Sequence, residues 1–234
     1  HRPGRLDRVL TTFFTGLVGY AHITSHHNGG HHVQVATPAD PTSARFNETL
    51  FAFIVRETIG GIRGALRREA ERIQRAGKSR WHPSNSLLQG YAVTIIAAVA
   101  LTAATGPVAI GIIAAHHAVV FSTYSAISYI EHYALLRERR ADGRYARVEP
   151  KHSWNTDYLL SNVLMINLQR HSDHHAHGAR PYQVLQSYEG LPTLPTGYPG
   201  CIMLALIPPV WFRVMNPRAV VWAGGDLNKL NRGE

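Results

Sequence analysis

The middle of the chain is a long apolar stretch without charge. Residues 81–130 contain no Asp, Glu, Lys or Arg. Because an α-helix rises about 1.5 Å per residue, roughly 20 apolar residues cross the hydrocarbon core of a bilayer. Residues 87–105 and 107–130 are each long enough, and Gly106-Pro107 between them favours a turn. The pattern predicts a transmembrane helical hairpin, since the alternative, a hairpin buried in a soluble protein, needs a larger chain to cover it.

Both flanks of the apolar stretch are rich in arginine. Residues 61–80 precede it and residues 135–147 follow it, so both ends of the hairpin are expected on the cytoplasmic side. In the first flank, apolar and basic residues occupy different helical faces. The apolar set is Ile62, Leu66, Ala70 and Ile73, and the basic set is Arg63, Arg67, Arg68 and Arg75. This spacing predicts an amphipathic helix on anionic headgroups, or a plain solvated helix, that ends at Gly77.

The rest of the chain is helical or irregular. Residues 155–169 have a helical period and lead into a histidine-rich segment, and the apolar residues 201–212 are too few to cross a bilayer. Alternations typical of strands are few. We therefore expect an all-α, integral membrane helical bundle in one domain over residues 1–234, with the hairpin at about 87–130 and cytoplasmic histidine-rich regions at 1–80 and 131–234.

Composition narrows the possible chemistry. The 234 residues include 15 histidines, one cysteine and a net charge of +9. A single cysteine excludes a disulfide framework, an all-cysteine zinc site and an iron–sulfur cluster held within this chain. The basic residues are not interleaved with aromatic ones, and no nucleic-acid-binding signature is present. No nucleic-acid partner is therefore expected, and the charge favours the cytoplasmic face of a membrane.

The histidines gather in four places. These are His1; His26, His27, His31 and His32; His132; and His171, His174, His175 and His177. Residues three and four apart on a helix share a face, so the last group can direct three imidazoles at a metal ion. His27 and His31 are likewise one turn apart, with His32 beside them. Three carboxylates could orient the imidazoles from behind, namely Asp40, Glu131 and Asp173.

Seven or eight imidazoles are too many for one ion and suit two. A ferritin-like di-iron site would need two Glu-x-x-His motifs, and only Glu149-x-x-His152 has that form, with Pro150 inside it. The His-Glu-x-x-His motif of zinc proteases is also missing from the sequence. Imidazole binds iron, zinc and copper alike, so the spacing alone does not select the metal.

The motifs HHNGGHHVQVATPADPTSARF, YIEHYALLRERRADGRY, HSWN and LQRHSDHHAHGARPYQVL resemble those of the membrane-bound non-haem di-iron alkane monooxygenases. These enzymes belong to the wider group of desaturases and hydroxylases with three histidine boxes. The resemblance covers nearly the whole chain. It implies eight metal ligands, which are His1 from the first box, His27, His31 and His32 from the second, His132, and His171, His174 and His175 from the third.

The resemblance also implies a C-terminal piece of a six-pass protein, with a ninth ligand outside this chain, so the isolated piece is expected to be inactive. It implies two iron ions that use O2 to hydroxylate n-alkanes, in a bacterial plasma membrane with the active site on the cytoplasmic side. Electrons would come from rubredoxin and its reductase, since the chain has no Cys-x-x-Cys. We expect Arg137, Arg139 and Arg140 to dock this acidic donor.

Several residues depart from the family pattern. His26 stands where the family usually has Glu, Ala134 where it has Gly, and Gly178 where it has Pro. None of these positions is an expected metal ligand, so the departures bear on the identity of the substrate and not on the metal site. Two enzymatic alternatives stay open: a xylene-type side-chain monooxygenase, and a fatty-acyl desaturase or hydroxylase. A membrane metal-binding protein without catalytic activity is the alternative from a different class.

Overall fold

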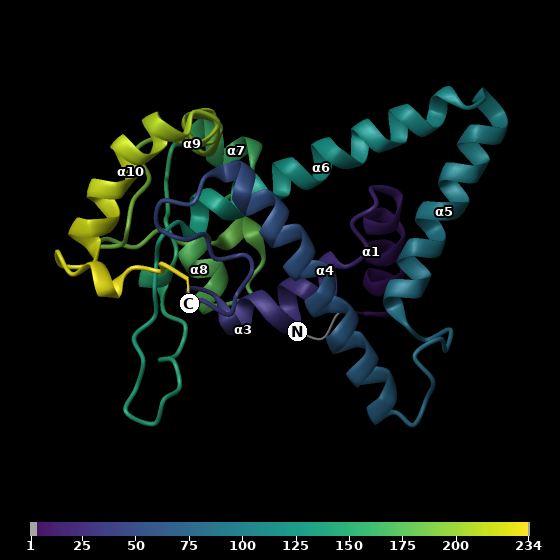
Figure 1. Ribbon diagram of the computed structural model, residues 1–234, viewed down its shortest axis with the longest axis horizontal. Helices are drawn as coiled ribbons and strands as arrows, with labels where there is room; N and C mark the ends of the chain where they lie inside the picture. The colour runs from purple at the N-terminus through teal and green to yellow at the C-terminus, as the bar shows by residue number, and fades with distance from the viewer. Residues whose placement is uncertain (1–3, 234) are drawn as a thin grey trace. The chain divides into compact units, whose positions relative to one another are not determined.

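A computed structural model describes residues 4–233, which form two compact units (Figure 1). Within the described residues, the first unit comprises 4–30 and 58–124, and the second comprises 31–57 and 125–233. The α-helices are α1 (Arg5–Leu17), α2 (Ile23–His26), α3 (His32–Gln34), α4 (Leu50–Arg75), α5 (Ser86–Thr105), α6 (Val108–His132), α7 (Leu159–Leu164), α8 (His171–Ala176), α9 (Tyr198–Ala205) and α10 (Pro208–Trp222).

Short helices of other types complete the secondary structure of this part of the chain. They are the π-helix η1 (His27–His31) and the 3-10 helices η2 (Pro150–His152), η3 (Tyr182–Val184) and η4 (Leu227–Lys229). Over residues 4–233, β structure is limited to isolated bridges. The predicted all-α class is therefore confirmed. His1 lies outside the described residues.

The predicted hairpin is present as α5 and α6. Helix α5 begins where the side chain of Asn85 accepts hydrogen bonds from the N–H groups of Leu87 and Leu88, at 3.0 and 3.2 Å. It ends at Gly106, whose φ of +85° suits glycine and turns the chain into α6. Both helices are long and apolar enough to cross a membrane, which confirms the two predicted spans.

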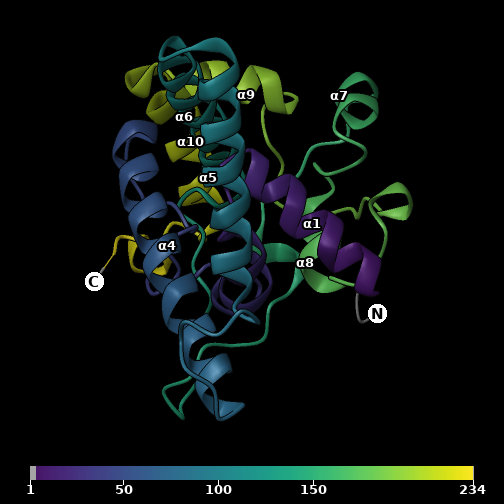
Figure 2. The same cartoon turned by 90° about the vertical axis from the view of Figure 1, so that its right-hand side faces the viewer.

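In the first unit, α1 packs along α5 (Figures 1 and 2). The two helices approach so closely that a Cβ atom at Gly16 would lie 2.5 Å from the carbonyl oxygen of Gly90. The hydroxyl of Thr94 donates a hydrogen bond to the Gly16 carbonyl, at 2.6 Å. Small residues and a hydroxyl that bridges two backbones are typical of helix pairs in a membrane.

Helix α4 confirms the predicted helix stop at Gly77. Gly77 has φ +68°, and the N–H of Lys78 donates to the carbonyl of Ile73 at 3.2 Å, as in a Schellman cap. The buried positions are Gly61, Ala65, Glu69 and Ile73, whereas Leu66 is 52% exposed. The helix thus packs within the protein through small residues, Glu69 and Ile73, and leaves Leu66 exposed, so the predicted contact with headgroups stays a prediction.

The core of the second unit is aromatic. Trp211 of α10 packs against Tyr129 and Tyr133 of the chain that ends α6, with ring centroids 5.3 Å apart in both pairs. All three residues are fully buried. Trp154 adds to this core and donates from Nε1 to the carbonyl of Tyr133 at 2.9 Å. This packing fixes the last turn of α6, which carries Glu131 and His132.

Candidate metal centre

The second histidine box begins in a π-helix. The five-residue helix His27–His31 holds Gly29 and Gly30, and it is followed directly by α3, which starts at His32. Single π-turns are frequent at functional sites because the wider turn changes the direction of neighbouring side chains. A Cβ at Gly30 would lie 2.7 Å from the Arg68 guanidinium, so the second glycine makes room for this α4 side chain.

Asp40 orients His31. Nδ1 of His31 lies 2.8 Å from Oδ2 of Asp40, and both side chains are buried. The same carboxylate accepts hydrogen bonds from the hydroxyl of Ser43 at 2.7 Å and from the N–H of Thr42 at 3.1 Å. A carboxylate accepts only, so Nδ1 of His31 carries the proton and Nε2 keeps its lone pair for a metal.

Glu131 contacts a histidine of the third box. Nδ1 of His171, in α8, lies 3.1 Å from Oε1 of Glu131. The hydroxyl of Tyr198 donates to the same oxygen at 2.7 Å, and all three side chains are buried. This contact again directs Nε2 of the imidazole away from the carboxylate. Asp40 and Glu131 thus each contact a different histidine on its Nδ1 side.

Four imidazoles converge in the interior of the second unit. Nε2 of His171 lies 3.2 Å from Nε2 of His132 and 3.0 Å from Nε2 of His175. The ring of His31 completes the set, with its centroid 4.6 Å from that of His132 and 4.8 Å from that of His175. One ligand atom from each of the four lies within 4.8 Å of the others.

These distances fit a metal ion. Nitrogen ligands bind an ion such as zinc at about 2.0–2.1 Å, so neighbouring ligand nitrogens lie on the order of 3 Å apart. The Nε2 separations of 3.0 and 3.2 Å match this value. The donor set therefore fits a metal that prefers nitrogen.

Burial favours the neutral form of three of these histidines. Burial lowers the pKa of His175 well below its usual range, and the nearby His171 and His31 lower it further. Burial lowers the pKa of His174 to about 4, and it also lowers the pKa of His32. At neutral pH these imidazoles keep a lone pair, which is the form that binds metal.

His32 and His174 form a second pair beside the cluster. Their ring centroids are 4.7 Å apart, and the His32 ring lies 4.6 Å from that of His175. Tyr182 stacks on His174, with centroids 5.1 Å apart and an angle of 22° between the rings. Because Tyr182 is 39% exposed and His174 only 5%, the tyrosine separates this histidine from solvent. His27, at the start of the π-helix, belongs to the first unit and is partly buried.

Asp173 does not face the metal cluster. Its carboxylate accepts hydrogen bonds from His177, Arg180 and Tyr188 at 2.6–2.7 Å and from the N–H of Gln186 at 2.8 Å. Burial alone would raise its pKa, but these donors lower it to about 2. The buried carboxylate therefore fastens α8 to residues 177–188, the segment that carries Tyr182.

The three arginines expected to dock an electron donor differ in exposure. Arg137 is 6% exposed and donates to the backbone carbonyls of Val33 and Ala146, at 2.8 and 3.0 Å. Its guanidinium therefore joins the segment after the second box to the loop after α6. Arg139 and Arg140 are exposed on that loop.

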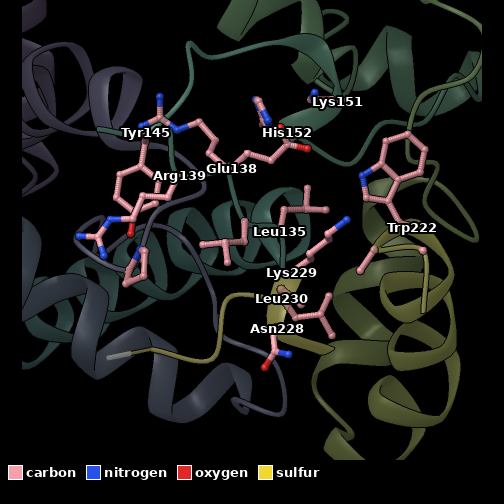
Figure 3. Close-up of a pocket in the computed structure, with 16 residues that line it drawn as sticks. Leu135, Glu138, Arg139, Tyr145, Lys151, His152, Trp222, Asn228, Lys229 and Leu230 are labelled. Atoms are coloured by element: carbon pink, nitrogen blue, oxygen red, sulfur yellow. The ribbon is translucent and has the colours of Figure 1, made fainter. Parts of the chain in front are cut away.

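A cavity of about 810 Å³ lies beside this loop, in the second unit (Figure 3). Arg139, Tyr145, His152, Trp222 and Lys229 are among the residues that line it. His152 accepts a hydrogen bond at Nδ1 from the N–H of Glu149, at 2.9 Å, and burial lowers its pKa to about 4. The single Glu-x-x-His sequence is thus a local turn, in line with its exclusion as a di-iron motif.

Sequence reasoning missed Tyr198, Tyr182 and Arg68. Tyr198 lies 67 positions from the Glu131 that it contacts. Arg68 donates from Nε to the carbonyl of Ser25, at 3.1 Å, although its place in α4 indicated a charged face toward headgroups. The hydrophobic pattern of a sequence does not indicate that a tyrosine is buried or that an arginine bonds to a distant backbone carbonyl. The YQV sequence after the third box belongs to the family motif, but its spacing gives no reason to expect that Tyr182 stacks on His174.

The profile of the fatty acid desaturase family matches residues 1–204. The chain is 44% identical over 231 residues to alkane 1-monooxygenase of Ectopseudomonas oleovorans, and 42% identical over 231 residues to alkane 1-monooxygenase 1 of Alcanivorax borkumensis. Both matches cover 98% of this chain and 57% of the relative. A more distant relative is the hydroxylase component XylM of xylene/toluene monooxygenase from Pseudomonas putida, with 26% identity over 95% of this chain and 59% of the relative. The chain thus spans less than two thirds of the length of these curated relatives.

Proposed function

Because the chain belongs to the fatty acid desaturase family, we propose that its buried histidines hold two iron ions and that the complete protein is an alkane 1-monooxygenase. The substrates would be O2 and medium- or long-chain n-alkanes, which are hydroxylated at a terminal carbon. The observation that carries this proposal is the convergence of His31, His132, His171 and His175 in a buried space. The identity to alkane 1-monooxygenases over nearly the whole chain supports the choice of reaction.

The first iron ion would be held by the four converging imidazoles. For the second ion we propose His32 and His174, together with His27 and His1 as the family resemblance implies. When bound, the two ions would supply the O2 activation that insertion into an unactivated C–H bond requires and that amino-acid side chains cannot perform alone. Rings that are already held in place need little reorganisation to bind metal.

Asp40 and Glu131 have the positioning role in this proposal. Each contacts the Nδ1 side of one histidine, His31 and His171 respectively, and so leaves Nε2 available to the metal. Their own orientation is fixed by further hydrogen bonds from Ser43 and Tyr198. Tyr182 covers His174 from the solvent side. These contacts hold the ligands and limit the access of water.

The place of His132 suits an apolar substrate. It is the last residue of α6, which is long and apolar enough to cross a membrane. Alkanes dissolve in the hydrocarbon core of a bilayer, so a metal site at the end of a span can receive them without passage through water. We propose that this end of α6 lies at the cytoplasmic side of the plasma membrane. There rubredoxin, reduced by its reductase, would deliver the electrons.

The test uses the complete protein in membranes, loaded with iron and supplied with rubredoxin and its reductase. With n-octane and hexadecane we expect O2-dependent formation of the 1-alkanols. His174→Ala should abolish turnover and lower the iron content. His177→Ala is the matched control, because this half-exposed histidine of the same box is bonded to Asp173 and is not a proposed ligand.

Full activity and iron content in His174→Ala would contradict the ligand assignment. Products from xylene or from acyl chains, with none from alkanes, would favour the side-chain monooxygenase or the desaturase. Failure of the iron-loaded protein to consume O2 with any of these substrates would favour a metal-binding protein without catalytic activity.

A further inference from the structure

Two segments of the second unit expose large apolar side chains. Helix α7 exposes Leu159 and Leu160, at 80% and 72%, and also Val163 and Leu164. The end of α9 and its connection to α10 expose Met203, Leu206 and Ile207. Soluble surfaces rarely gather so many apolar side chains, and a patch of this kind marks an interaction site. We refer to these seven residues as the apolar surface.

The two segments are neighbours. A Cβ atom at Gly197, the residue before α9, would overlap the side chain of Ser161 in α7. The hydroxyl of Tyr158, which precedes α7, lies 3.5 Å from the carbonyl oxygen of Pro195. In Figure 2, α7 projects from the body of the second unit on the side where α9 begins. One partner can therefore contact both segments.

The apolar surface is also free of charge. Residues 158–169 and residues 190–212 contain no Asp, Glu, Lys or Arg. Protein interfaces that form and dissociate carry a polar rim with charged residues, whereas acyl chains require surfaces without charge. The composition of both segments thus favours lipid over a soluble protein partner.

The same region is joined to the end of a membrane span. Trp211, near the start of α10, packs against Tyr129 in the last turns of α6 and against Tyr133 just beyond it. Tyr and Trp are enriched where membrane helices leave the hydrocarbon core. Helices α9 and α10 together are apolar enough to be a broken membrane element, with a bend of 119° between them.

We propose that α7 and the bend between α9 and α10 insert together into one leaflet of the bilayer, where the apolar surface contacts acyl chains. The inserted chain turns before reaching the other leaflet, since α9 has only 8 residues. This contact would hold the histidine cluster against the membrane from a second side. It does not depend on which metal or substrate the site takes.

The experiment uses the complete protein in lipid nanodiscs, in a background without cysteines in which Cys201 is replaced by Ala. Leu160→Cys and Ile207→Cys are labelled with bimane, and the nanodiscs contain either ordinary or brominated phosphatidylcholine. Ile96→Cys, exposed on the span α5, is the lipid-facing reference. Val184→Cys is the matched control, because it is an exposed apolar residue of the second unit outside the apolar surface.

We expect brominated lipid to quench the labels at positions 160 and 207 about as strongly as at position 96, and far more strongly than at position 184. Iodide in the water should show the opposite order. Labels at 160 and 207 that iodide quenches and lipid does not would place the surface in water, and labels protected from both quenchers would place it against protein. Either result overturns the proposal. Val163→Cys and Met203→Cys give the same measurement if one of the first variants does not fold.

Discussion

The imidazole of His31 and the carboxylate of Asp40 form a buried pair, with Nδ1 and Oδ2 2.8 Å apart. The pair joins the end of the π-helix to the loop after α3, over nine positions of sequence. The hydroxyl of Ser43 and the N–H of Thr42 donate further hydrogen bonds to this carboxylate. The histidine is thus oriented by a carboxylate that is itself fixed, an arrangement that metal sites use to keep ligands in position.

Asp40→Asn should weaken metal binding while the protein still folds. The amide is nearly the same size, but its NH2 group would face Nδ1 of His31 and favour the tautomer with the proton on Nε2. Loss of such a supporting carboxylate typically costs about 10–100-fold in metal affinity. The measurement is iron retained by the complete protein against a chelator series.

Ser43→Ala is the control for this variant. It removes one hydrogen bond to Asp40, and also the bond from the N–H of Ala36 to the serine hydroxyl, but leaves the His31 contact in place. We expect a small loss of stability with metal retention near that of the unchanged protein. Equal metal retention in Asp40→Asn and the unchanged protein would show that Asp40 does not set the tautomer.

Much of the fold follows from local sequence signals. The charge-free stretch predicted α5 and α6, and within it Asn85 caps the start of α5 while Gly106, with its positive φ, ends that helix. In α4 the helix and its stop at Gly77 follow from the sequence, whereas the inward-packing Gly61, Ala65 and Glu69 are small or charged and carry no hydrophobic signal. Hydrophobic period locates a helix well, but it does not identify contacts made by small or charged side chains.

The site was predictable in its residue types but not in its pairing. Residues at i, i+3 and i+4 share a helical face, yet His171 and His175 join one cluster while His174 turns to His32 and Tyr182. Asp173 lies on the same short helix, but its carboxylate accepts hydrogen bonds from residues 177–188 instead. Sequence spacing places side chains within reach of each other, and the tertiary path of the loops decides which contact forms.

Tyr198→Phe should destabilise the protein and have a smaller effect on metal binding than Asp40→Asn. The variant removes the donor to the buried Glu131 carboxylate but leaves His171 in contact with it. Removal of the donor to a buried acceptor costs about 1–3 kcal/mol. Thermal unfolding of the purified protein measures the change. Tyr158→Phe is the control, since its hydroxyl makes one long, exposed contact of 3.5 Å. An equal unfolding temperature in both variants would contradict the role of Tyr198.

Glu69→Gln should lower stability in a pH-dependent way. Burial alone would raise the pKa of Glu69, but hydrogen bonds from Arg72 and from the N–H and hydroxyl of Ser86 lower it below its usual 4.5. The Glu69 carboxylate, which contacts Ser86 at the start of α5, thus stabilises the fold fully above pH 4.5. It loses this effect as the pH falls through the lowered pKa. The difference in unfolding temperature between the variant and the unchanged protein should be largest at pH 7 and should shrink below pH 4.5.

Glu71→Gln is the matched control for Glu69. Its carboxylate is half exposed and lies 3.9 and 3.5 Å from Arg67 and Arg75, so its ion pairs contribute only about 0–1 kcal/mol. We expect almost no change in its unfolding temperature at any pH. A pH-independent difference in Glu69→Gln would show that the carboxylate acts by packing and not by charge.

Reversing the charge of Arg139 and Arg140 together should raise the KM for the electron donor several-fold and leave kcat almost unchanged. Both arginines are exposed on the loop after α6, and exposed charges at the rim of an interface mainly affect the rate of association. The effect should fade as salt is added, because ions screen charges in water. Arg218→Glu, on the exposed side of α10, is the control.

Arg137→Glu should instead reduce the yield of folded protein, because it leaves the carbonyls of Val33 and Ala146 without their buried donor. A KM that is unchanged in the double variant at low salt would move the donor site away from this loop.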